Sequence, residues 1–583
     1  MQEIKILIAG EDGVGKSTLI MSLIKDQFVN SVQEILPEVT IPPEITLENI
    51  TAHIKDSSSK MEYRDQIIND LKKSDVLCLI YSCIDRDSFL KIPDYWLTLV
   101  KSLNLKIPII IIGNKEDLKI ESNSPISFEE EVLPLMNLYQ EIEGCMECSS
   151  KELINHSEVF YLAQKAVLYP SNPLYDYNEK TLTKPCYNAF KRIFSLIDLD
   201  KDDILNDYEL NEFQKKCFDA PLSETELQSI KQVIRENEMN GIHEEGFTLF
   251  GFLFLIGIFI KNGRLETVWT ILKKFHYNLD LNLDENYVRP YFEVPSNCTV
   301  ELSPSGYQFF TEIFKAYDKD NDGALNEHEL NDLFELCPKT VKFPWDKSDF
   351  PDNVVTNQSN AVTLQGFLAM WSLTTLQDHQ TTLSYLAYLG FDENPLNGIR
   401  LVAPNHLLSQ YKNYKVFKRN VFFGYVLGGH GSGKTSLLKA FVKKEFNPAY
   451  KATVKPFTVI NPVDLLGVEK YLVLEEVGAN YEAAILQNIR KLEQCDLLCL
   501  VYDSADPNSF LTILHLREQY QLDHIPYVIV ATKSDLETVR QRIDDQPEEY
   551  CKKNEIAMPV KISVKNGDLD RLFNLFASVA MNR

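Results

Sequence analysis

Near its start the chain reads Gly10-Glu11-Asp12-Gly13-Val14-Gly15-Lys16-Ser17, and near its end it reads Gly428-Gly429-His430-Gly431-Ser432-Gly433-Lys434-Thr435. Both stretches fit G-x-x-x-x-G-K-[ST], a loop whose backbone N–H groups and lysine surround phosphate oxygens. An apolar run precedes each loop, and residues with helical apolar spacing follow it. Phosphate binding requires this order of strand, glycine loop and helix. The sequence therefore predicts an α/β phosphate-binding domain at each end.

The two ends share a second motif. Asn114-Lys115-Glu116-Asp117 in the first half corresponds to Thr532-Lys533-Ser534-Asp535 in the second. Lys434 lies 418 positions after Lys16, and Asp535 lies 418 positions after Asp117. Because two independent motifs keep one register, the two ends are copies of one duplicated domain.

The second motif predicts which base is bound. Asn114-Lys115-Glu116-Asp117 follows a buried apolar strand at 107–112, and there it resembles the guanine-specificity motif of small, Ras-like GTPases. In that family the Asp carboxylate accepts hydrogen bonds from the N1 and N2 protons of guanine, a pattern that adenine cannot supply. Glu147-Cys148-Ser149-Ser150-Lys151 and Ser563-Val564-Lys565 resemble the family's last base-contacting loop. The resemblance implies GTP or GDP as the ligand, together with Mg²⁺.

The predicted nucleotide-binding residues come from the same motifs in both copies. They are Gly13, Val14, Gly15, Lys16, Ser17, Thr18, Asn114, Lys115, Asp117, Ser149, Ser150 and Lys151 in the first copy, and Gly431, Ser432, Gly433, Lys434, Thr435, Ser436, Thr532, Lys533, Asp535, Ser563, Val564 and Lys565 in the second. The expected magnesium ligands are Ser17, Thr40, Asp56 and Thr435. Thr46 is an alternative to Thr40, and the sequence does not distinguish Thr453 from Thr458 in the second copy.

The segment that would support hydrolysis is unusual in both copies. Ras-like proteins use D-x-x-G-Q, in which the Gln orients the attacking water. The first copy reads Asp56-Ser57-Ser58-Ser59-Lys60 and the second reads Glu475-Glu476-Val477-Gly478-Ala479, so Lys60 and Ala479 occupy the Gln position. No catalytic residue is assigned. Slow GTP hydrolysis and nucleotide binding without useful turnover both remain open.

Two acidic stretches between the copies match the calcium loop of an EF-hand. Such a loop needs oxygen ligands at positions 1, 3, 5, 7, 9 and 12 and Gly at position 6. The first loop offers Asp198, Asp200, Asp202, Ile204, Asn206 and Glu209, and the second offers Asp318, Asp320, Asp322, Ala324, Asn326 and Glu329. Gly323 occupies position 6 of the second loop, whereas Asp203 occupies it in the first. Because a residue with a side chain reaches positive φ only at some cost, weaker calcium binding is expected at the first loop.

Each acidic loop belongs to a larger repeat. The second loop begins 120 positions after the first, and the apolar segment at 363–368 begins 115 positions after the one at 248–253. A degenerate second hand is expected around residues 240–247. The predicted domains are a GTPase domain at 1–169, EF-hand units at 170–290 and 291–405, and a second GTPase domain at 406–583.

The bulk composition restricts the class of partner and the compartment. The formal net charge of −25 argues against a nucleic-acid partner, because no basic face is expected. The 11 cysteines show no framework spacing and the first residues lack signal-peptide features, which together favour a reducing, cytosolic setting. The apolar run at 249–260 is shorter than the roughly 20 residues that a membrane helix needs, so no transmembrane segment is expected.

The order GTPase, paired EF-hand units and second GTPase resembles the mitochondrial Rho GTPase family, Miro, over essentially the whole chain. The resemblance implies two Ras-like P-loop α/β domains that flank an all-α tandem EF-hand region. In that family apolar helices, matched here by residues 249–260 and 362–373, act as built-in ligands of the EF-hand pockets. The family is anchored on the cytosolic face of the mitochondrial outer membrane by a C-terminal helix, which would be expected soon after Arg583.

The resemblance also implies a function. We expect a calcium- and GTP-regulated switch that couples mitochondria to motor-adaptor proteins for mitochondrial transport and homeostasis, with slow GTP hydrolysis. GTPase-activating or exchange proteins are further expected partners. The alternative is a nucleotide-binding scaffold without useful turnover that binds partners when calcium is present. Because built-in helices would already fill the EF-hand pockets, only a modest structural response to calcium is expected.

Overall fold

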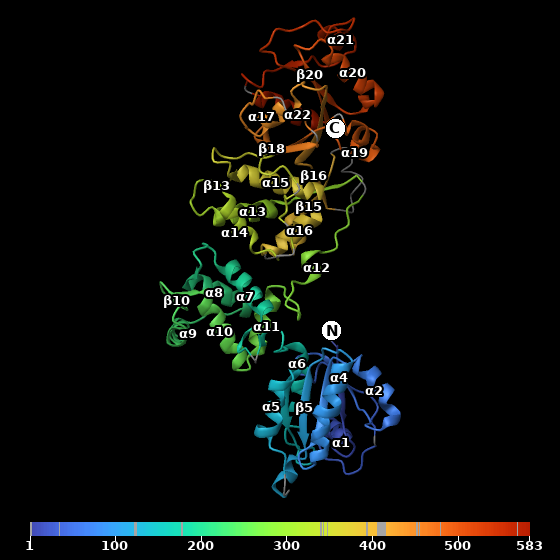
Figure 1. Cartoon of the computed structure of the whole chain (residues 1–583), viewed down its shortest axis with the longest axis vertical. Coiled ribbons are helices and arrows are strands. Elements are labelled where there is room, and N and C mark those ends of the chain that lie inside the picture. Colours follow the sequence, from blue (N-terminus) through green and yellow to red (C-terminus); the bar gives the residue numbers. More distant parts are fainter. Residues whose placement is uncertain are drawn as a thin grey trace. The chain divides into compact units, whose positions relative to one another are not determined.

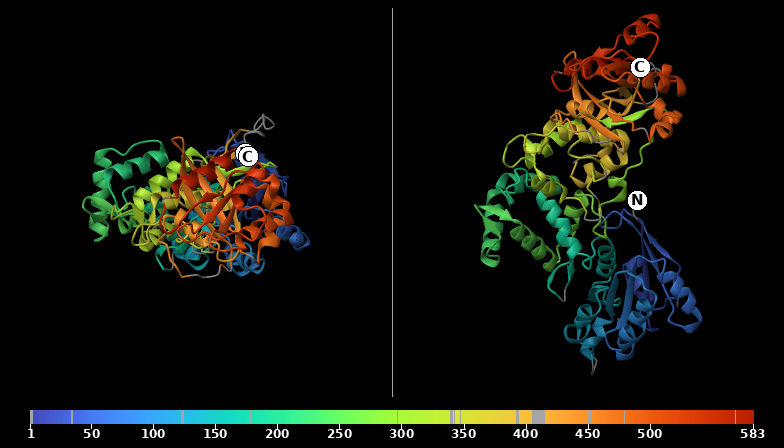
Figure 2. Two further views of the ribbon diagram at one scale, coloured as in Figure 1. Left: turned by 90° about the horizontal axis from the view of Figure 1, so that it is seen from above. Right: turned by 45° about the horizontal axis from the view of Figure 1, so that its top comes forward.

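The computed structural model describes residues 3–583 except residues 34, 122–124, 177–178, 296, 339–340, 342, 347, 392–393, 405–414, 450–452, 454, 479 and 568. The chain divides into two compact units, which can be followed by colour in Figure 1 and in the two further views of Figure 2. One unit contains Met1–Ile197 and Asp203–Asn282, and the other contains Asp198–Asp202 and Leu283–Arg583. Each unit has a six-stranded sheet and a helical region.

The N-terminal sheet has the strand order β2-β3-β1-β4-β5-β6. Its strands are β1 (Glu3–Gly10), β2 (Val39–Ile41), β3 (Thr51–Lys55), β4 (Val76–Ser82), β5 (Ile109–Asn114) and β6 (Ile142–Glu147). Neighbouring strands are parallel except for β2 with β3. The strands β4 and β5 are buried along their whole length, which explains their continuous apolar sequences. The phosphate loop follows the carboxyl end of β1, where ligands bind in sheets of this kind.

Helices cover both faces of this sheet. The core on one face includes residues of α1 and α6, and the core on the other includes residues of α2, α3 and α5. The helices are α1 (Lys16–Lys25), α2 (Arg64–Leu71), α3 (Arg86–Lys91), α4 (Thr98–Ser102), α5 (Leu133–Leu138) and α6 (Glu158–Leu168), with short 3₁₀ or π segments at Met61–Tyr63, Ile92–Leu97, Glu116–Glu121 and Phe128–Val132.

The first EF-hand region contains two helix–loop–helix hands. Its elements are β7 (Tyr175–Asp176), β8 (Thr181–Leu182), α7 (Lys184–Ile197), β9 (Ile204–Leu205), α8 (Asp207–Phe218), α9 (Glu224–Asn237), β10 (Ile242–His243), β11 (Gly246–Thr248), α10 (Leu249–Lys261) and α11 (Leu265–Lys274). Residues 240–247, where a degenerate hand was expected, connect α9 to α10. Strand β11 pairs antiparallel with β9 of the acidic loop, which places Phe247 opposite Leu205.

The apolar run at 249–260 has a different place from the one expected. It forms α10, which follows β11 directly and is capped by Thr248. Since β11 pairs with β9, α10 is the second helix of the degenerate hand and not a separate helix placed in a pocket. Helix α11 follows and packs against α8 and α10. The assignment of residues 249–260 as a built-in ligand is therefore corrected, because the segment that follows the paired hands is α11.

The second EF-hand region repeats this plan. Its elements are α12 (Glu285–Val288), β12 (Thr299–Leu302), α13 (Pro304–Tyr317), β13 (Ala324–Leu325), α14 (Glu327–Phe334), β14 (Val362–Thr363), α15 (Leu364–Gln377), α16 (His379–Tyr388), the 3₁₀ turn Pro395–Gly398, β15 (Ile399–Ala403) and β16 (Val416–Lys418). Strand β14 pairs with β13 and places Val362 opposite Leu325. Residues 362–373 thus form β14 and the exit helix α15, and α16 follows them, so the same correction applies here.

The C-terminal sheet has the order β18-β19-β17-β20-β21-β22, and its only antiparallel pair among the described strands is β18 with β19. Its strands are β17 (Val421–Gly428), β18 (Phe457–Leu465), β19 (Val468–Glu476), β20 (Leu497–Asp503), β21 (Tyr527–Thr532) and β22 (Val560–Lys561). The helices are α17 (Lys434–Phe441), α18 (Glu482–Leu486), α19 (Ile489–Glu493), α20 (Ser509–Gln519), α21 (Pro547–Lys553) and α22 (Asp570–Met581), with a 3₁₀ turn at Leu522–His524. The order of strands repeats that of the N-terminal sheet, as a duplicated domain requires.

The second EF-hand region and the C-terminal sheet share one hydrophobic core. Val421, Ile460, Tyr471 and Val473 of the sheet belong to the same buried cluster as the EF-hand aromatics. The ring of Tyr471 stacks on that of Tyr307, with centroids 5.6 Å apart. The predicted domain boundary between residues 405 and 406 lies within 405–414, outside the described residues. Strand β15, which precedes this segment, pairs with β16, which follows it.

A buried carboxylate also joins these two parts. Glu301 on β12 is 1% exposed, and its Oε1 accepts hydrogen bonds from the backbone N–H groups of Asn420 and Val421, each at 2.8 Å. Its Oε2 lies 3.2 Å from Arg400. Burial raises the pKa of Glu301, while these N–H groups and the arginine oppose that shift. The start of β17, the first strand of the C-terminal sheet in chain order, is therefore held by a side chain of the preceding region.

Candidate nucleotide and calcium sites

The N-terminal phosphate loop is closed around its lysine. The Nζ of Lys16 donates to the carbonyl oxygens of Gly10 at 2.9 Å and Glu11 at 2.8 Å. Burial lowers the pKa of Lys16, and the carboxylates of Asp12, Asp56 and Glu11 act against that shift. Gly15 has φ 98°, and a Cβ there would lie 2.4 Å from Asn114 Nδ2. Only glycine therefore fits at this position, where the loop meets the base motif.

The C-terminal phosphate loop has the same construction. Lys434 Nζ donates to the carbonyl oxygens of Gly428 at 2.8 Å and Gly429 at 2.9 Å. Burial lowers the pKa of Lys434 as well. Gly433 precedes α17 with φ 91°, in the left-handed region, as Gly15 does before α1. Thr18 and Ser436 lie in the first turns of these helices.

In the N-terminal copy the base motif, residues 114–117, contacts both the phosphate loop and the last base-contacting loop, residues 147–151. Asn114 Nδ2 donates to the carbonyl oxygen of Val14 at 3.0 Å, and its Oδ1 accepts from the Ser150 N–H at 3.2 Å. Lys115 Nζ donates to the Gly13 carbonyl oxygen at 2.6 Å. The Ser149 hydroxyl donates to Asp117 Oδ1 at 2.6 Å. The exposed Lys151 lies beside them, with its Nζ 3.9 Å from Glu152.

The C-terminal base motif is similar except at its lysine. The Thr532 hydroxyl donates to the Ser432 carbonyl oxygen at 2.7 Å, and the Ser563 hydroxyl donates to Asp535 Oδ1 at 2.8 Å. Lys533 Nζ, however, is 2.6 Å from Asp503 Oδ2 and not on a phosphate-loop carbonyl. Val564 is half-buried and Lys565 is exposed in the same loop as Ser563. The base loops thus meet in both copies, with a different lysine partner in each.

The expected magnesium ligands of the N-terminal copy are only partly brought together. The Ser17 hydroxyl donates to Asp56 Oδ2 at 2.6 Å. Thr40 lies on β2, and its hydroxyl is 3.1 Å from His53 Nδ1. The alternative, Thr46, donates to the Ile50 carbonyl oxygen at 2.7 Å. The structure instead brings the N–H of Leu36 to Asp56 Oδ2 at 3.1 Å, which no sequence motif indicates.

The two threonines left open by the sequence of the C-terminal copy have different neighbours. The Thr435 hydroxyl donates to Glu476 Oε2 at 2.7 Å, and the Thr435 and Thr453 hydroxyl oxygens lie 2.9 Å apart. Thr458 donates to Glu475 Oε2 at 3.1 Å and lies on β18. Thr453 is therefore the better candidate for the threonine that would contact magnesium and the γ-phosphate from switch I, the segment between the phosphate-loop helix α17 and strand β18.

Glu476 and not Glu475 takes the position of Asp56. Strand pairing matches Leu7 with Lys55 in the first copy and, 418 positions after Leu7, Tyr425 with Glu475 in the second, so the next residues, Asp56 and Glu476, are equivalent. Ala479, assigned to the Gln position by counting from Glu475, lies outside the described residues. Counting from Glu476 moves that position to Asn480. Asn shares the amide group of Gln on a shorter side chain.

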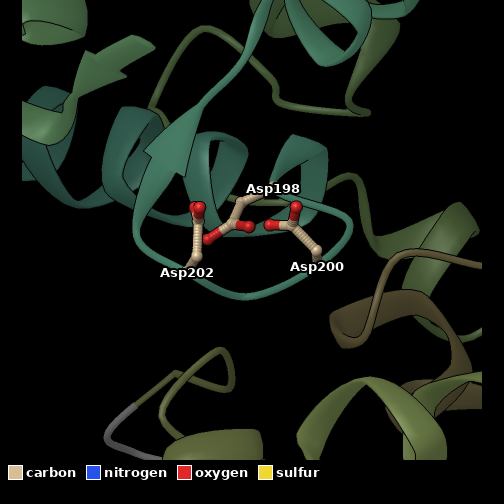
Figure 3. A group of neighbouring side chains, drawn as sticks. All are labelled: Asp198, Asp200 and Asp202. Carbon is tan, nitrogen blue, oxygen red and sulfur yellow. The ribbon is translucent and has the colours of Figure 1, made fainter. Parts of the chain in front are cut away.

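The first calcium loop gathers its leading carboxylates. Ligand oxygens of Asp198, Asp200 and Asp202 all lie within 4.8 Å of one another, and Figure 3 shows the three carboxylates pointing toward a common centre. Asp203 has φ 65°, so the residue at position 6 does adopt the left-handed conformation. Downstream, Asn206 caps α8 and its backbone N–H donates to Glu209 Oε2 at 3.0 Å.

The second calcium loop is similarly arranged. Oxygens of Asp318, Asp320 and Asp322 lie within 4.8 Å of one another, and Gly323 has φ 82°. The buried Glu329 accepts hydrogen bonds from the backbone N–H groups of Lys319 at 2.9 Å and Asn326 at 3.0 Å. Three carboxylates this close repel one another, and a divalent cation with oxygen preference would relieve that repulsion.

Comparisons with known proteins agree with this geometry. A Ras family model matches residues 5–169 and 425–581, and two models described as "EF hand associated" match residues 220–306 and 345–409. A protein of Cryptococcus neoformans named Mitochondrial Rho GTPase 1 is 44% identical, covering 99% of this chain and 90% of its own. Proteins of that name from Mycosarcoma maydis (42% identical, 100% and 86% covered) and Schizosaccharomyces pombe (39%, 97% and 89%) also match. The chain belongs to the mitochondrial Rho GTPase family.

Membership of the mitochondrial Rho GTPase family confirms the predicted fold class, in which Ras-like domains flank an EF-hand region. It also supports GTPase activity, with GTP or GDP and Mg²⁺ as the ligands that Ras-like domains imply and calcium as the ligand that EF-hands suggest. Over the described residues, no helix has both the length and the apolar character needed to span a bilayer.

Changing Asp203 to Gly in this mitochondrial Rho GTPase should strengthen calcium binding at the first loop. The left-handed conformation at φ 65° costs a residue with a side chain about 1 kcal/mol, which corresponds to about fivefold in affinity. Calorimetric calcium titration of the full chain measures this. Asp203→Asn is the control, because it removes the charge but keeps a side chain that reaches the same conformation. An equal gain in both variants would assign the effect to charge and contradict the conformational explanation.

Proposed function

We propose that this chain is a calcium- and GTP-regulated switch on the cytosolic face of the mitochondrial outer membrane, where it couples mitochondria to motor-adaptor proteins. The observation that carries the proposal is the meeting of phosphate loop and base loop in both copies, through Asn114 on Val14 and Thr532 on Ser432. Two clusters of carboxylates suited to calcium occur in the same chain. The mitochondrial placement rests on the relatives, which carry "mitochondrial" in their names, and the adaptors rest on the family resemblance alone.

Within this proposal, the assigned nucleotide, magnesium and calcium residues act as the sequence predicted, with two changes. In switch I of the second copy, Thr453 is chosen over Thr458 as the magnesium ligand. Glu476 is added to Thr435 as a side chain linked to magnesium. A carboxylate one methylene longer than Asp still reaches the hydroxyl of Thr435 at 2.7 Å. The proposed domain limits are those of the sequence, with the last two domains folding on one core.

The proposal is tested by the nucleotide dependence of partner binding. Purified full chain is offered to an immobilised motor-adaptor protein in four conditions, with GTP or GDP and with calcium or a chelator. We expect binding that differs between GTP and GDP and between calcium and chelator. Equal capture in all four conditions would overturn the switch and favour a passive scaffold.

We further propose that hydrolysis in the N-terminal domain is slow because Lys60 stands where a water-orienting Gln is usual. Lys60→Gln should raise its single-turnover rate of phosphate release on the order of tenfold. The measurement uses a Lys434→Ala background to silence the other site, and Lys73→Gln, an exposed substitution on the same domain, is the matched control. Equal rates in Lys60→Gln and the parent would show that the missing Gln does not limit turnover.

A second candidate function applies to the C-terminal domain alone. There the base-motif lysine is drawn to Asp503, and Glu replaces Asp beside the magnesium position. These departures favour a domain that binds nucleotide with little turnover. Phosphate release from a Lys16→Ala chain tests this, since turnover equal to that of the N-terminal domain would exclude it.

A further inference from the structure

The second calcium loop is joined to the loop before β14 by a single side chain. Asn357 Nδ2 donates to Asp322 Oδ2 at 3.1 Å. The Oδ1 of the same amide accepts from the backbone N–H groups of Ser359 at 3.1 Å and Ala361 at 2.9 Å. Asn357 therefore both shapes its own loop and holds it to a carboxylate of the calcium cluster. A displacement of the Asp322 carboxylate therefore acts directly on this loop.

The same loop receives a lysine from the C-terminal GTPase domain. Lys444 Nζ donates to the Thr356 hydroxyl at 2.8 Å and to Asn360 Oδ1 at 3.0 Å, and it lies 3.7 Å from Asp352 Oδ1. The Lys444 side chain is 20% exposed, and burial lowers its pKa. A partly buried ammonium with three oxygen partners is held more firmly than a lysine in a fully exposed surface pair. Lys444 is thus held by the loop that Asn357 organises.

Lys444 occupies a sensitive position in the GTPase domain. It follows α17, the helix that begins at the phosphate-loop residue Lys434, and it precedes the segment that leads to Thr453. The hydroxyl of Thr453 lies 2.9 Å from that of Thr435. Lys444 therefore fixes the point where the phosphate-loop helix ends and switch I begins. In the N-terminal copy the position 418 residues earlier is Asp26, so this contact belongs to one copy only.

We propose that Lys444 is a positioning residue through which calcium at the second EF-hand slows nucleotide release from the C-terminal GTPase domain. The inference rests on the calcium and nucleotide sites proposed above. Without calcium, the three carboxylates repel one another, and Asp322 is held only through its hydrogen bonds, such as those from Ala324 and Asn357. Calcium fixes Asp322 and hence the Asn357 loop, so Lys444 holds the start of switch I in place. Switch segments of such domains order against the bound nucleotide and its Mg²⁺, and we infer that holding the start of switch I in place slows nucleotide release.

The test measures release of fluorescent mant-GDP from the full chain, with calcium or with a chelator. All proteins carry Lys16→Ala, so that the signal reports the C-terminal site. Calcium should slow release by about fivefold, at the lower end of typical couplings between sites. Lys444→Met keeps the aliphatic stem but removes the ammonium, and it should abolish the difference. Lys439→Met, an exposed change on the same helix, should retain it.

Two further measurements separate the possible failures. Calorimetry of the same proteins should show calcium bound at the second loop in both Met variants. In the parent, bound GDP should raise calcium affinity by the same factor by which calcium raises the equilibrium affinity for GDP. Failure of the parent to bind calcium or nucleotide would overturn the proposed function and this inference with it. Binding of both without coupling, or equal coupling in Lys444→Met and parent, would overturn the inference alone.

Discussion

Lys16→Ala should reduce the affinity of the N-terminal domain for GTP and GDP by about a hundredfold. The ammonium of Lys16 is held between two carbonyl oxygens at 2.8–2.9 Å, at the mouth of a loop whose N–H groups are available to phosphate. A hydrogen bond to a charged partner contributes about 1.5–3 kcal/mol, and the phosphate oxygens would lose the cation that this loop supplies. Nucleotide released on denaturation, counted per chain by chromatography, measures the loss.

The matched control for that experiment is Lys25→Ala, at the far end of the same helix and exposed. It should leave nucleotide content unchanged. The C-terminal site provides a second control, because it should keep its nucleotide in Lys16→Ala and lose it in Lys434→Ala. Full nucleotide content in Lys16→Ala chains would contradict the assignment of the N-terminal loop as a phosphate site.

Glu329→Gln should remove one of two calcium sites. An EF-hand uses both oxygens of the residue at position 12, and an amide offers one neutral oxygen instead. We expect about a hundredfold weaker binding at this loop, on the order of the contribution of a lost charged ligand. Calcium titration of the full chain should then show a stoichiometry that falls from two to one, with the first loop still binding.

Folding should survive Glu329→Gln, because the amide oxygen still accepts the N–H of either Lys319 or Asn326. Glu327→Gln is the matched control, since Glu327 lies on the same helix but is exposed and outside the ligand positions. A melting curve in the absence of calcium checks the fold. Undiminished stoichiometry in Glu329→Gln would refute the ligand assignment of the second loop.

The sequence was most informative where chemistry is local. A phosphate loop needs its glycines and lysine within eight positions, and an EF-hand loop needs its ligands within twelve, so both could be recognised without a fold. The parallel sheet then followed, because each motif must come after a buried strand. The left-handed conformation of Asp203 was also predictable, since position 6 of the loop demands it whatever the residue.

Features that depend on strand register or on distant segments could not be predicted. Glu475 and Glu476 are adjacent and identical in type, and only the pairing of Val426 with Glu476 shows which faces Thr435. The choice of Thr453 over Thr458 depends in the same way on where β18 begins. The apolar sequence at 249–260 does not show whether it forms the second helix of the degenerate hand or a separate helix in an EF-hand pocket, because either position would bury it.

The core shared by the second EF-hand region and the C-terminal sheet has a consequence for biosynthesis. A ribosome releases the EF-hand region first, before it has made Val421, Ile460 and Tyr471, which complete that region's interior. Domains made in sequence generally fold in sequence, and an unfinished one exposes apolar surface that invites misassembly. Here the interior of the EF-hand region stays incomplete until Val473 has been made, so apolar surface is exposed throughout this stretch of translation.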